Sequence, residues 1–196
     1  MAYSHSWKAF ERTCAKNTAE WWDGNPKHFR RLYLKAGWPW ADGKGPDIVR
    51  ILDPNVKEPT PDMIDHSFFL WLECKKRKAF NFYDLMSQEP SESSATEWFS
   101  ETYRRAKEAK KHPMVFVRYP GSSRVLIMLE NKLLKGISDL KKGKKGLRYI
   151  RTTAKPYERK KPILVGIVAA KEFFRIVTPD DMAKAYYAIR KKEKAS

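Results

Sequence analysis

The chain of 196 residues has only two cysteines and four histidines, and it has no long apolar run. Two cysteines cannot build a disulfide framework or a structural zinc site of paired cysteines, and the histidines lack ligand spacing. The longest apolar stretch, residues 163–170, has eight residues, whereas a membrane-spanning helix needs about 20. Residues 1–10 also lack the apolar centre of a signal peptide. We therefore expect a cytoplasmic protein with free thiols and no membrane partner.

Apolar side chains and positive charge are both abundant. Hydrophobic residues make up 42% of the chain and aromatic residues 13%, which is enough to pack a core in a domain-sized protein. The formal net charge is +17, and residues 103–161 alone hold 19 basic and 4 acidic side chains. Because lysine and arginine neutralise phosphates, this stretch predicts a nucleic acid as partner.

Basic residues at several places are candidates for contacts with DNA phosphates. Some follow the predicted strand 68–72, some lie on a predicted helix, and four lie in a lysine-rich loop around Gly143. Taken alone, each group is also explained as a solvated cationic surface. The candidates are Lys44, Lys76, Arg77, Lys78, Arg104, Arg105, Lys141, Lys142, Lys144 and Lys145.

Hydrophobic spacing and turn residues predict the order helix, hairpin, helix, hairpin, strand, helix. Ser6 can cap the first helix, which ends near Gly24, and Ser94 with Glu97 forms a capping box for a helix to residue 111. Thr178 begins the last helix, with Pro179 at its first position. The strands are predicted at residues 47–52, 68–72, 114–119, 124–129 and 163–169. This order predicts an α/β fold with a mixed central sheet flanked by helices.

The first hairpin brings together Asp47, Glu73 and Lys75. Glu73 and Lys75 point to one face of an extended chain, because strand side chains alternate. In an antiparallel hairpin the residue numbers of every opposed pair add up to the same value, here called the index sum. Setting Asp47 opposite Glu73 therefore also aligns residues 48–52 with 68–72. Carboxylates can hold a divalent metal ion for phosphodiester hydrolysis, and a lysine can assist the attacking water.

Other acidic residues fit this geometry less well. Pairing Asp62 with Glu73 puts the turn near residues 66–69, which contain no glycine, proline or asparagine. Glu130 ends a similar strand, but its partner by the same sum is Pro113, which cannot bind a metal ion. The alternative for the first hairpin is that Asp47 ends a loop and Glu73 and Lys75 form a surface ion pair.

The runs Gly43-Lys44-Gly45-Pro46-Asp47-Ile48 and Trp71-Leu72-Glu73-Cys74-Lys75 resemble the PD-(D/E)XK nuclease superfamily, especially its archaeal and phage Holliday junction resolvases. Glu11 strengthens the resemblance, because that branch has a glutamate on its first helix that faces the metal site. The resemblance covers residues 6–119. It implies a restriction-endonuclease-like core at residues 1–129. Residues 130–196 lie outside the resemblance, and we expect them to be a basic C-terminal extension packed on the same domain.

The resemblance implies a catalytic set of Glu11, Asp47, Glu73 and Lys75. Asp47, Glu73 and the backbone carbonyl of Cys74 would bind Mg²⁺, which Mn²⁺ can replace, and Glu11 would bind directly or through water. Lys75 would orient or activate the attacking water, while the Cys74 side chain packs in the core. The implied function is a Mg²⁺-dependent endodeoxyribonuclease selective for branched DNA, acting as a homodimer, in the host cytoplasm if it is phage-encoded. The alternatives are another DNA-processing nuclease and a non-catalytic nucleic-acid-binding protein.

Overall fold

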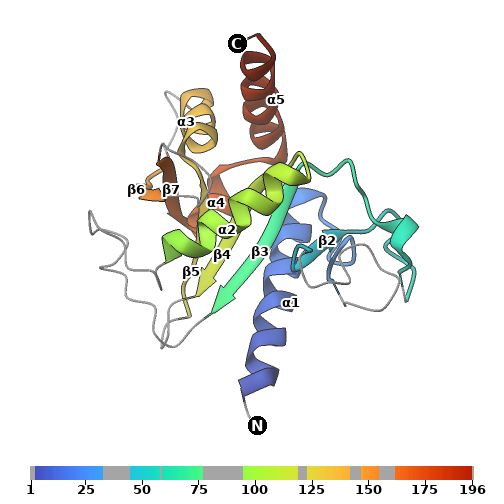
Figure 1. The fold of residues 1–196 in the computed structure, drawn as a ribbon. Coiled ribbons are helices and arrows are strands. Elements are labelled where there is room, and N and C mark those ends of the chain that lie inside the picture. Colours follow the sequence, from blue (N-terminus) through green and yellow to red (C-terminus); the bar gives the residue numbers. More distant parts are fainter. Residues whose placement is uncertain are drawn as a thin grey trace.

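The computed structural model describes residues 3–32, 45–57, 59–76, 95–118, 123–141, 147–154 and 162–195 (Figure 1). These residues form a seven-stranded sheet of order β1-β2-β3-β4-β5-β7-β6. The strands are β1 (Phe29–Arg31), β2 (Ile48–Arg50), β3 (Leu70–Lys76), β4 (His112–Arg118), β5 (Val125–Glu130), β6 (Ile150–Ala154) and β7 (Ile163–Ala169). The helices are α1 (Tyr3–Trp22), α2 (Ala95–Glu108), α3 (Asn131–Leu140), α4 (Ala170–Ile176) and α5 (Pro179–Ala195), with a 3₁₀ turn at Pro61–Met63.

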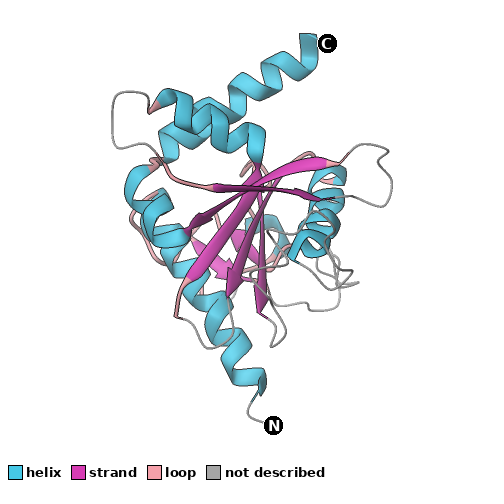
Figure 2. Cartoon of the chain, turned by 90° about the vertical axis from the view of Figure 1, so that its left-hand side faces the viewer, coloured by secondary structure: helices cyan, strands magenta, loops and turns pink. Residues whose placement is uncertain are grey.

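Helices cover both faces of the sheet (Figure 2). On one face, α2 packs Trp98, Phe99 and Tyr103 against Val115 and neighbouring side chains, so these aromatic residues belong to the core. The other face packs against α1 and α4, and its core includes alternate residues of β3, such as Leu72 and Cys74. The predicted α/β class with a mixed sheet is confirmed.

The two predicted hairpin registers are both confirmed. Ile48 lies opposite Leu72, which has the index sum predicted from Asp47 and Glu73. In the second hairpin Met114 lies opposite Leu129, the register that aligns Pro113 with Glu130. Between the hairpins, β3 and β4 run parallel and are joined by a crossover that contains α2, because parallel neighbours cannot be joined by a tight turn.

The first hairpin is shorter on one side than predicted. β2 ends at Arg50 rather than Leu52, because Ile51 forms a bridge with Ile64 and the Leu52 N–H donates to the Met63 carbonyl. β3 begins at Leu70 rather than Phe68 and continues to Lys76. The proline-rich segment between the strands contains a 3₁₀ turn, as expected for a region without strand pattern.

The helix ends differ from the predicted ones in a few places. Helix α1 begins at Tyr3, so Ser6 lies inside the helix and is not its cap, contrary to the prediction. α2 ends at Glu108 rather than residue 111, and its predicted cap Ser94 lies outside the described residues. At α5 the prediction is confirmed, because the Asp181 N–H donates to Thr178 Oγ1 at 3.2 Å and the Thr178 N–H donates to the Asp181 carboxylate at 2.8 Å.

Residues 130–196, predicted as a basic extension on the same domain, supply two strands of the central sheet. β7 pairs with β5, and β6 pairs with β7 at the sheet edge. Helices α3 and α5 contact each other, and α3 also contacts β7. Among the described residues, no helix is long and apolar enough to cross a membrane.

Candidate active site

Asp47 lies directly before β2, and its side chain forms a hydrogen bond with a backbone N–H of β3. Its Oδ2 accepts a hydrogen bond of 2.7 Å from the backbone N–H of Cys74, and its own N–H donates to the Leu72 carbonyl at 3.0 Å. β3 extends past the start of β2, so the Asp47 carboxylate takes the place of a strand partner. The confirmed register thereby puts a carboxylate beside the Glu73-Cys74-Lys75 segment.

Glu73 is buried, with 4% of its surface exposed, and its two carboxylate oxygens differ in their contacts. Oε1 accepts a hydrogen bond of 2.8 Å from Lys75 Nζ. Oε2 is buried and has no hydrogen-bond partner among the described residues. A buried carboxylate oxygen without a partner is costly and is suited to a cation, so this pair of carboxylates fits a divalent metal ion.

Electrostatics at Asp47 also favour a bound cation. Burial of the carboxyl and the nearby charge of Glu73 raise the pKa of Asp47 to about 7, although the Cys74 N–H, Lys75 and Arg31 act in the opposite direction. Two carboxylates in a partly dry site repel each other, and a divalent cation relieves that repulsion. Asp47 and Glu73 are therefore two carboxylates that disfavour each other's negative charge.

Glu11 lies near this site on α1 and is buried, with 2% of its surface exposed. Its carboxylate accepts hydrogen bonds from the Trp7 indole and from the Arg31 guanidinium. Within the described part of the chain, no three His, Cys, Asp or Glu side chains are grouped as metal ligands. A metal-ligand role for Glu11 therefore stays a prediction.

Arg31 is the site residue that the sequence did not single out. It lies on β1 and forms an ion pair with Glu11, and its positive charge lowers the pKa of Asp47. Arg31 therefore interacts with both acidic residues. The local sequence Phe29-Arg30-Arg31 carries no turn or alternation signal that would place it there. Only the pairing of β1 with β2 brings it to the site.

The Cys74 side chain points away from its sequence neighbours Glu73 and Lys75, as predicted. Its side chain is fully buried in the core on the α1 face, together with Cys14. Burial, followed by contact with Cys14, raises the pKa of the Cys74 thiol well above its ordinary value. A neutral buried thiol is a poor nucleophile, so the chemistry of the site belongs to its oxygen and ammonium groups.

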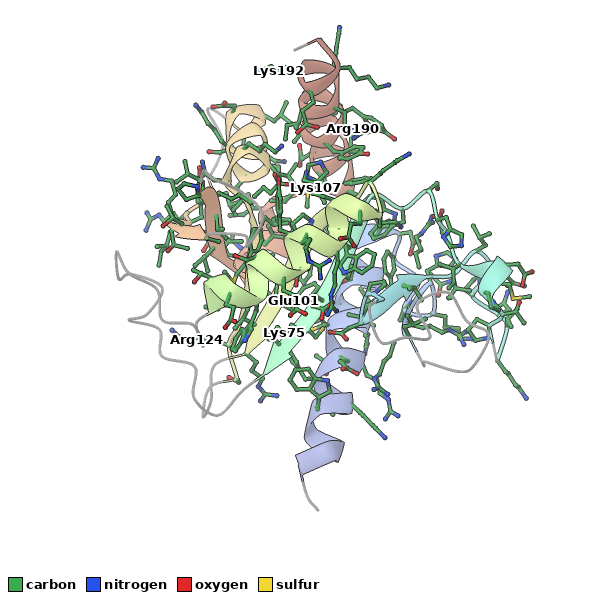
Figure 3. The ribbon with its side chains drawn as sticks, viewed as in Figure 1. Lys75, Glu101, Lys107, Arg124, Arg190 and Lys192 are labelled. Atoms are coloured by element: carbon green, nitrogen blue, oxygen red, sulfur yellow. The ribbon has the colours of Figure 1, made fainter. Side chains whose placement is uncertain are left out.

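The described DNA-binding candidates lie on α2 and at the end of α3. Arg104 and Arg105 form ion pairs with Glu108 and Glu101 along α2, and Lys141 pairs with Asp181 at 2.5 Å. Figure 3 shows Glu101 near the middle of α2 in this view, with Lys75 below it, and Lys107 toward the upper end of the helix. Lys76 ends β3, but its side chain is outside the described set, as are Lys44, Arg77, Lys78, Lys142, Lys144 and Lys145 altogether.

Glu130, the rival acidic residue, belongs to a separate ionic cluster. Its Oε1 lies 2.6 Å from His112 Nδ1 and accepts a hydrogen bond of 3.1 Å from Lys107, while its Oε2 lies 3.2 Å from Lys132 Nζ. Burial alone would raise the pKa of this carboxyl, but the His112 hydrogen bond and the nearby lysines lower it to about 2. Lys132 also binds Glu193, so the cluster joins α2, β4, β5, α3 and α5.

One comparison with known proteins found a family for this chain. The model of a family described as "Phage putative PDDEXK endonuclease" matches residues 7–184, which include most of α1, the carboxylate pair, Lys75 and most of the C-terminal half. No curated protein and no solved structure matches the chain significantly. The chain therefore belongs to this family of phage PDDEXK endonucleases, whose name supports nuclease activity, the hydrolysis of phosphodiester bonds with DNA as substrate.

Proposed function

We propose that the protein is a Mg²⁺-dependent endodeoxyribonuclease whose active site contains Asp47, Glu73 and Lys75. The observation that supports this most strongly is the buried, unpartnered Oε2 of Glu73 beside a second carboxylate. Asp47, Glu73 and the Cys74 carbonyl would hold the ion, which Mn²⁺ can replace, with Glu11 as a further ligand directly or through water. When bound, the ion acts as a Lewis acid on a phosphate oxygen and lowers the pKa of a bound water.

Each side chain of the site has a proposed task. Lys75 lies against Glu73, and its ammonium donates to the attacking water and stabilises negative charge that develops on the phosphate. Asp47 and Glu73 would hold the ion from fixed positions, because the Asp47 carboxylate accepts a hydrogen bond from the Cys74 N–H and the Glu73 carboxylate accepts one from Lys75. Arg31 is held by Glu11 and limits the negative charge around Asp47.

We propose branched DNA, with a four-way junction first, as the substrate, and a homodimer as the active form. The resemblance to junction resolvases supports both, because a twofold dimer can present two sites to two symmetric strands. The basic residues of α2 beside β3 support contacts with the DNA backbone.

The proposed function is tested with end-labelled four-way junction, linear duplex and single-stranded DNA, each in Mg²⁺ and in EDTA. We expect paired symmetric nicks in the junction, which EDTA abolishes. Cleavage of all three substrates would retain the nuclease and remove the junction preference. Metal-independent binding without cleavage of any substrate would instead support a non-catalytic nucleic-acid-binding protein.

The metal site can also be tested through stability, without an activity assay. We expect Asp47→Asn to raise the free energy of unfolding in EDTA at pH 8 by at least about 1 kcal/mol, because it removes a charge that burial and Glu73 disfavour. The folded pKa of Asp47 lies above its ordinary value, so its charge destabilises the fold increasingly as pH rises from about 4 to about 7, and the penalty is constant above that. Thermal unfolding measures this, and Mg²⁺ should stabilise the wild type but not the variant. A variant that is less stable in EDTA, or equal stabilisation of both by Mg²⁺, would count against the site.

A further inference from the structure

A large groove lies on the face of the sheet opposite α2. Its cavity volume is about 1210 Å³, and it runs between α1, the start of β5 and α4. Val125 and Phe174 on its walls pack against the core of the α1 face, whereas Val115 and Met128 belong to the α2 face. Glu73 points away from that core, because its neighbours Leu72 and Cys74 point into it. The groove is therefore distinct from the carboxylate site.

The groove has a cationic lining of four residues that come from three separate parts of the chain. Arg124 precedes β5, Arg148 precedes β6, and Lys171 and Arg175 lie one helical turn apart on α4. Arg148, Lys171 and Arg175 have no ion-pair partner within the described ranges. The acidic residues of the lining are Glu20, which pairs with Lys16 at 3.6 Å, and Glu172. Net positive charge in a concave surface favours a polyanionic ligand.

Aromatic rings accompany these cations. Trp21 lines the groove and is held in place because its indole N–H donates to the Val177 carbonyl at 2.6 Å. Its ring centroid lies 5.4 Å from that of Phe174, which also lines the groove and is only partly buried. Arginines beside partly exposed aromatic rings are the combination by which proteins bind single-stranded nucleic acid, with phosphates on the cations and bases on the rings.

The groove begins at the sheet end where β3 carries Lys75. Lys75 lies opposite Val117 of β4, and Val117 lies opposite Leu126 of β5. Two strand spacings, about 10 Å, therefore separate the site strand from the strand that begins at the groove. A flexible single strand can bend round this end of the sheet, whereas a stiff duplex, with a persistence length of about 150 base pairs, does not follow such a bend.

We propose that this groove binds a single strand of DNA outside the active site. Its occupant is an unpaired segment, such as a tail or a displaced strand next to the cleaved duplex. The link to cleavage rests on the proposed nuclease function, but the binding itself does not. The substrate would then be branched DNA that also carries an unpaired segment.

The test measures binding in EDTA, so that it does not depend on cleavage. Fluorescence anisotropy would follow a labelled oligothymidylate of about 12 nucleotides and a blunt hairpin duplex. We expect the double variant Arg148→Gln/Arg175→Gln to weaken oligothymidylate binding at least about fivefold. The slope of log K against log salt concentration should also become shallower by about 1.4, because each lost phosphate contact removes about 0.7 from this slope. The blunt duplex should bind nearly as before.

The matched control is Lys191→Gln/Lys194→Gln, which removes the same charge from exposed positions of α5. We expect it to change oligothymidylate binding by less than about twofold. All four positions are exposed, and thermal unfolding would verify that both variants are folded. Equal losses in the two double variants, equal losses for duplex and single strand, or no loss at all would overturn the proposal. Loss of binding in the groove variant would support it even if the wild type cleaved no DNA.

Discussion

Glu73→Gln is expected to reduce the single-turnover rate of DNA cleavage by about 10³-fold or more. The glutamine keeps the size of the side chain and can still accept from Lys75, but it removes the negative charge at the buried position whose Oε2 lacks a partner. An uncharged amide is a weak ligand for Mg²⁺, so the loss should appear in the rate and in the metal concentration needed. Quenched-flow cleavage of labelled DNA over a Mg²⁺ series measures both.

The matched control for this change is Glu108→Gln on α2. Glu108 is exposed and pairs with Arg104, so its charge is lost without touching the carboxylate pair. We expect the control to cleave at nearly the wild-type rate and both variants to bind DNA in EDTA. If Glu73→Gln cleaved within about tenfold of the wild type, the buried carboxylate would not be part of the catalytic site.

Glu130→Gln is expected to lower the free energy of unfolding at pH 7 by about 3 kcal/mol. Glu130 is buried among His112, Lys107 and Lys132, and an amide removes the negative charge that these three side chains contact, although Lys132 keeps its ion pair with Glu193. The lowered pKa of about 2, against an ordinary 4.5, corresponds to about 3 kcal/mol of stability. Urea unfolding of the two proteins measures the difference.

The pH dependence distinguishes this charge effect from a packing defect. The folded pKa lies below the unfolded one, so the Glu130 contribution is complete above about pH 4.5 and is lost as pH falls toward about 2. We therefore expect the difference between wild type and variant to shrink in acid. A difference that stays constant from pH 7 to pH 3 would show that the cluster stabilises the fold through packing rather than charge.

The position of the carboxylate pair was predictable because hairpin geometry is restrictive. A single index sum had to satisfy the apolar strands, the proline-rich loop and the placement of Asp47, and the observed pairing of Ile48 with Leu72 has that sum. The first and last helices were predictable for a similar reason, since spacing and termination signals agreed. The exact ends were less so, as the start of α1 before Ser6 shows.

The elements that were not predicted have weak local signals. β1 has three residues, two of them arginines, and exists through its pairing with β2. α3 follows β5 without a turn, and its first position has no side-chain cap. β6 is an edge strand with exposed residues at its start. Their stability comes from tertiary pairing, which a local pattern does not report.

The ionic cluster around Glu130 shows the limit of the pairing rule. The rule correctly aligned Pro113 with Glu130 and therefore dismissed this carboxylate as a metal ligand. It did not indicate that His112, the next residue along, would reach Glu130 from the end of β4. A side chain at the end of a strand can bend round the end of the sheet to reach the other face, and backbone register alone does not predict this.

The central claim is that Asp47, set by the hairpin register, belongs to a metal-dependent nuclease site. The most direct measurement compares Mg²⁺-dependent DNA cleavage by Asp47→Asn and Asp62→Asn, because both residues follow a proline and Asp62 is exposed on the 3₁₀ turn. We expect Asp47→Asn to lose cleavage by at least about 10²-fold and Asp62→Asn to retain it. Loss of cleavage in Asp62→Asn, with retention in Asp47→Asn, would contradict the assignment.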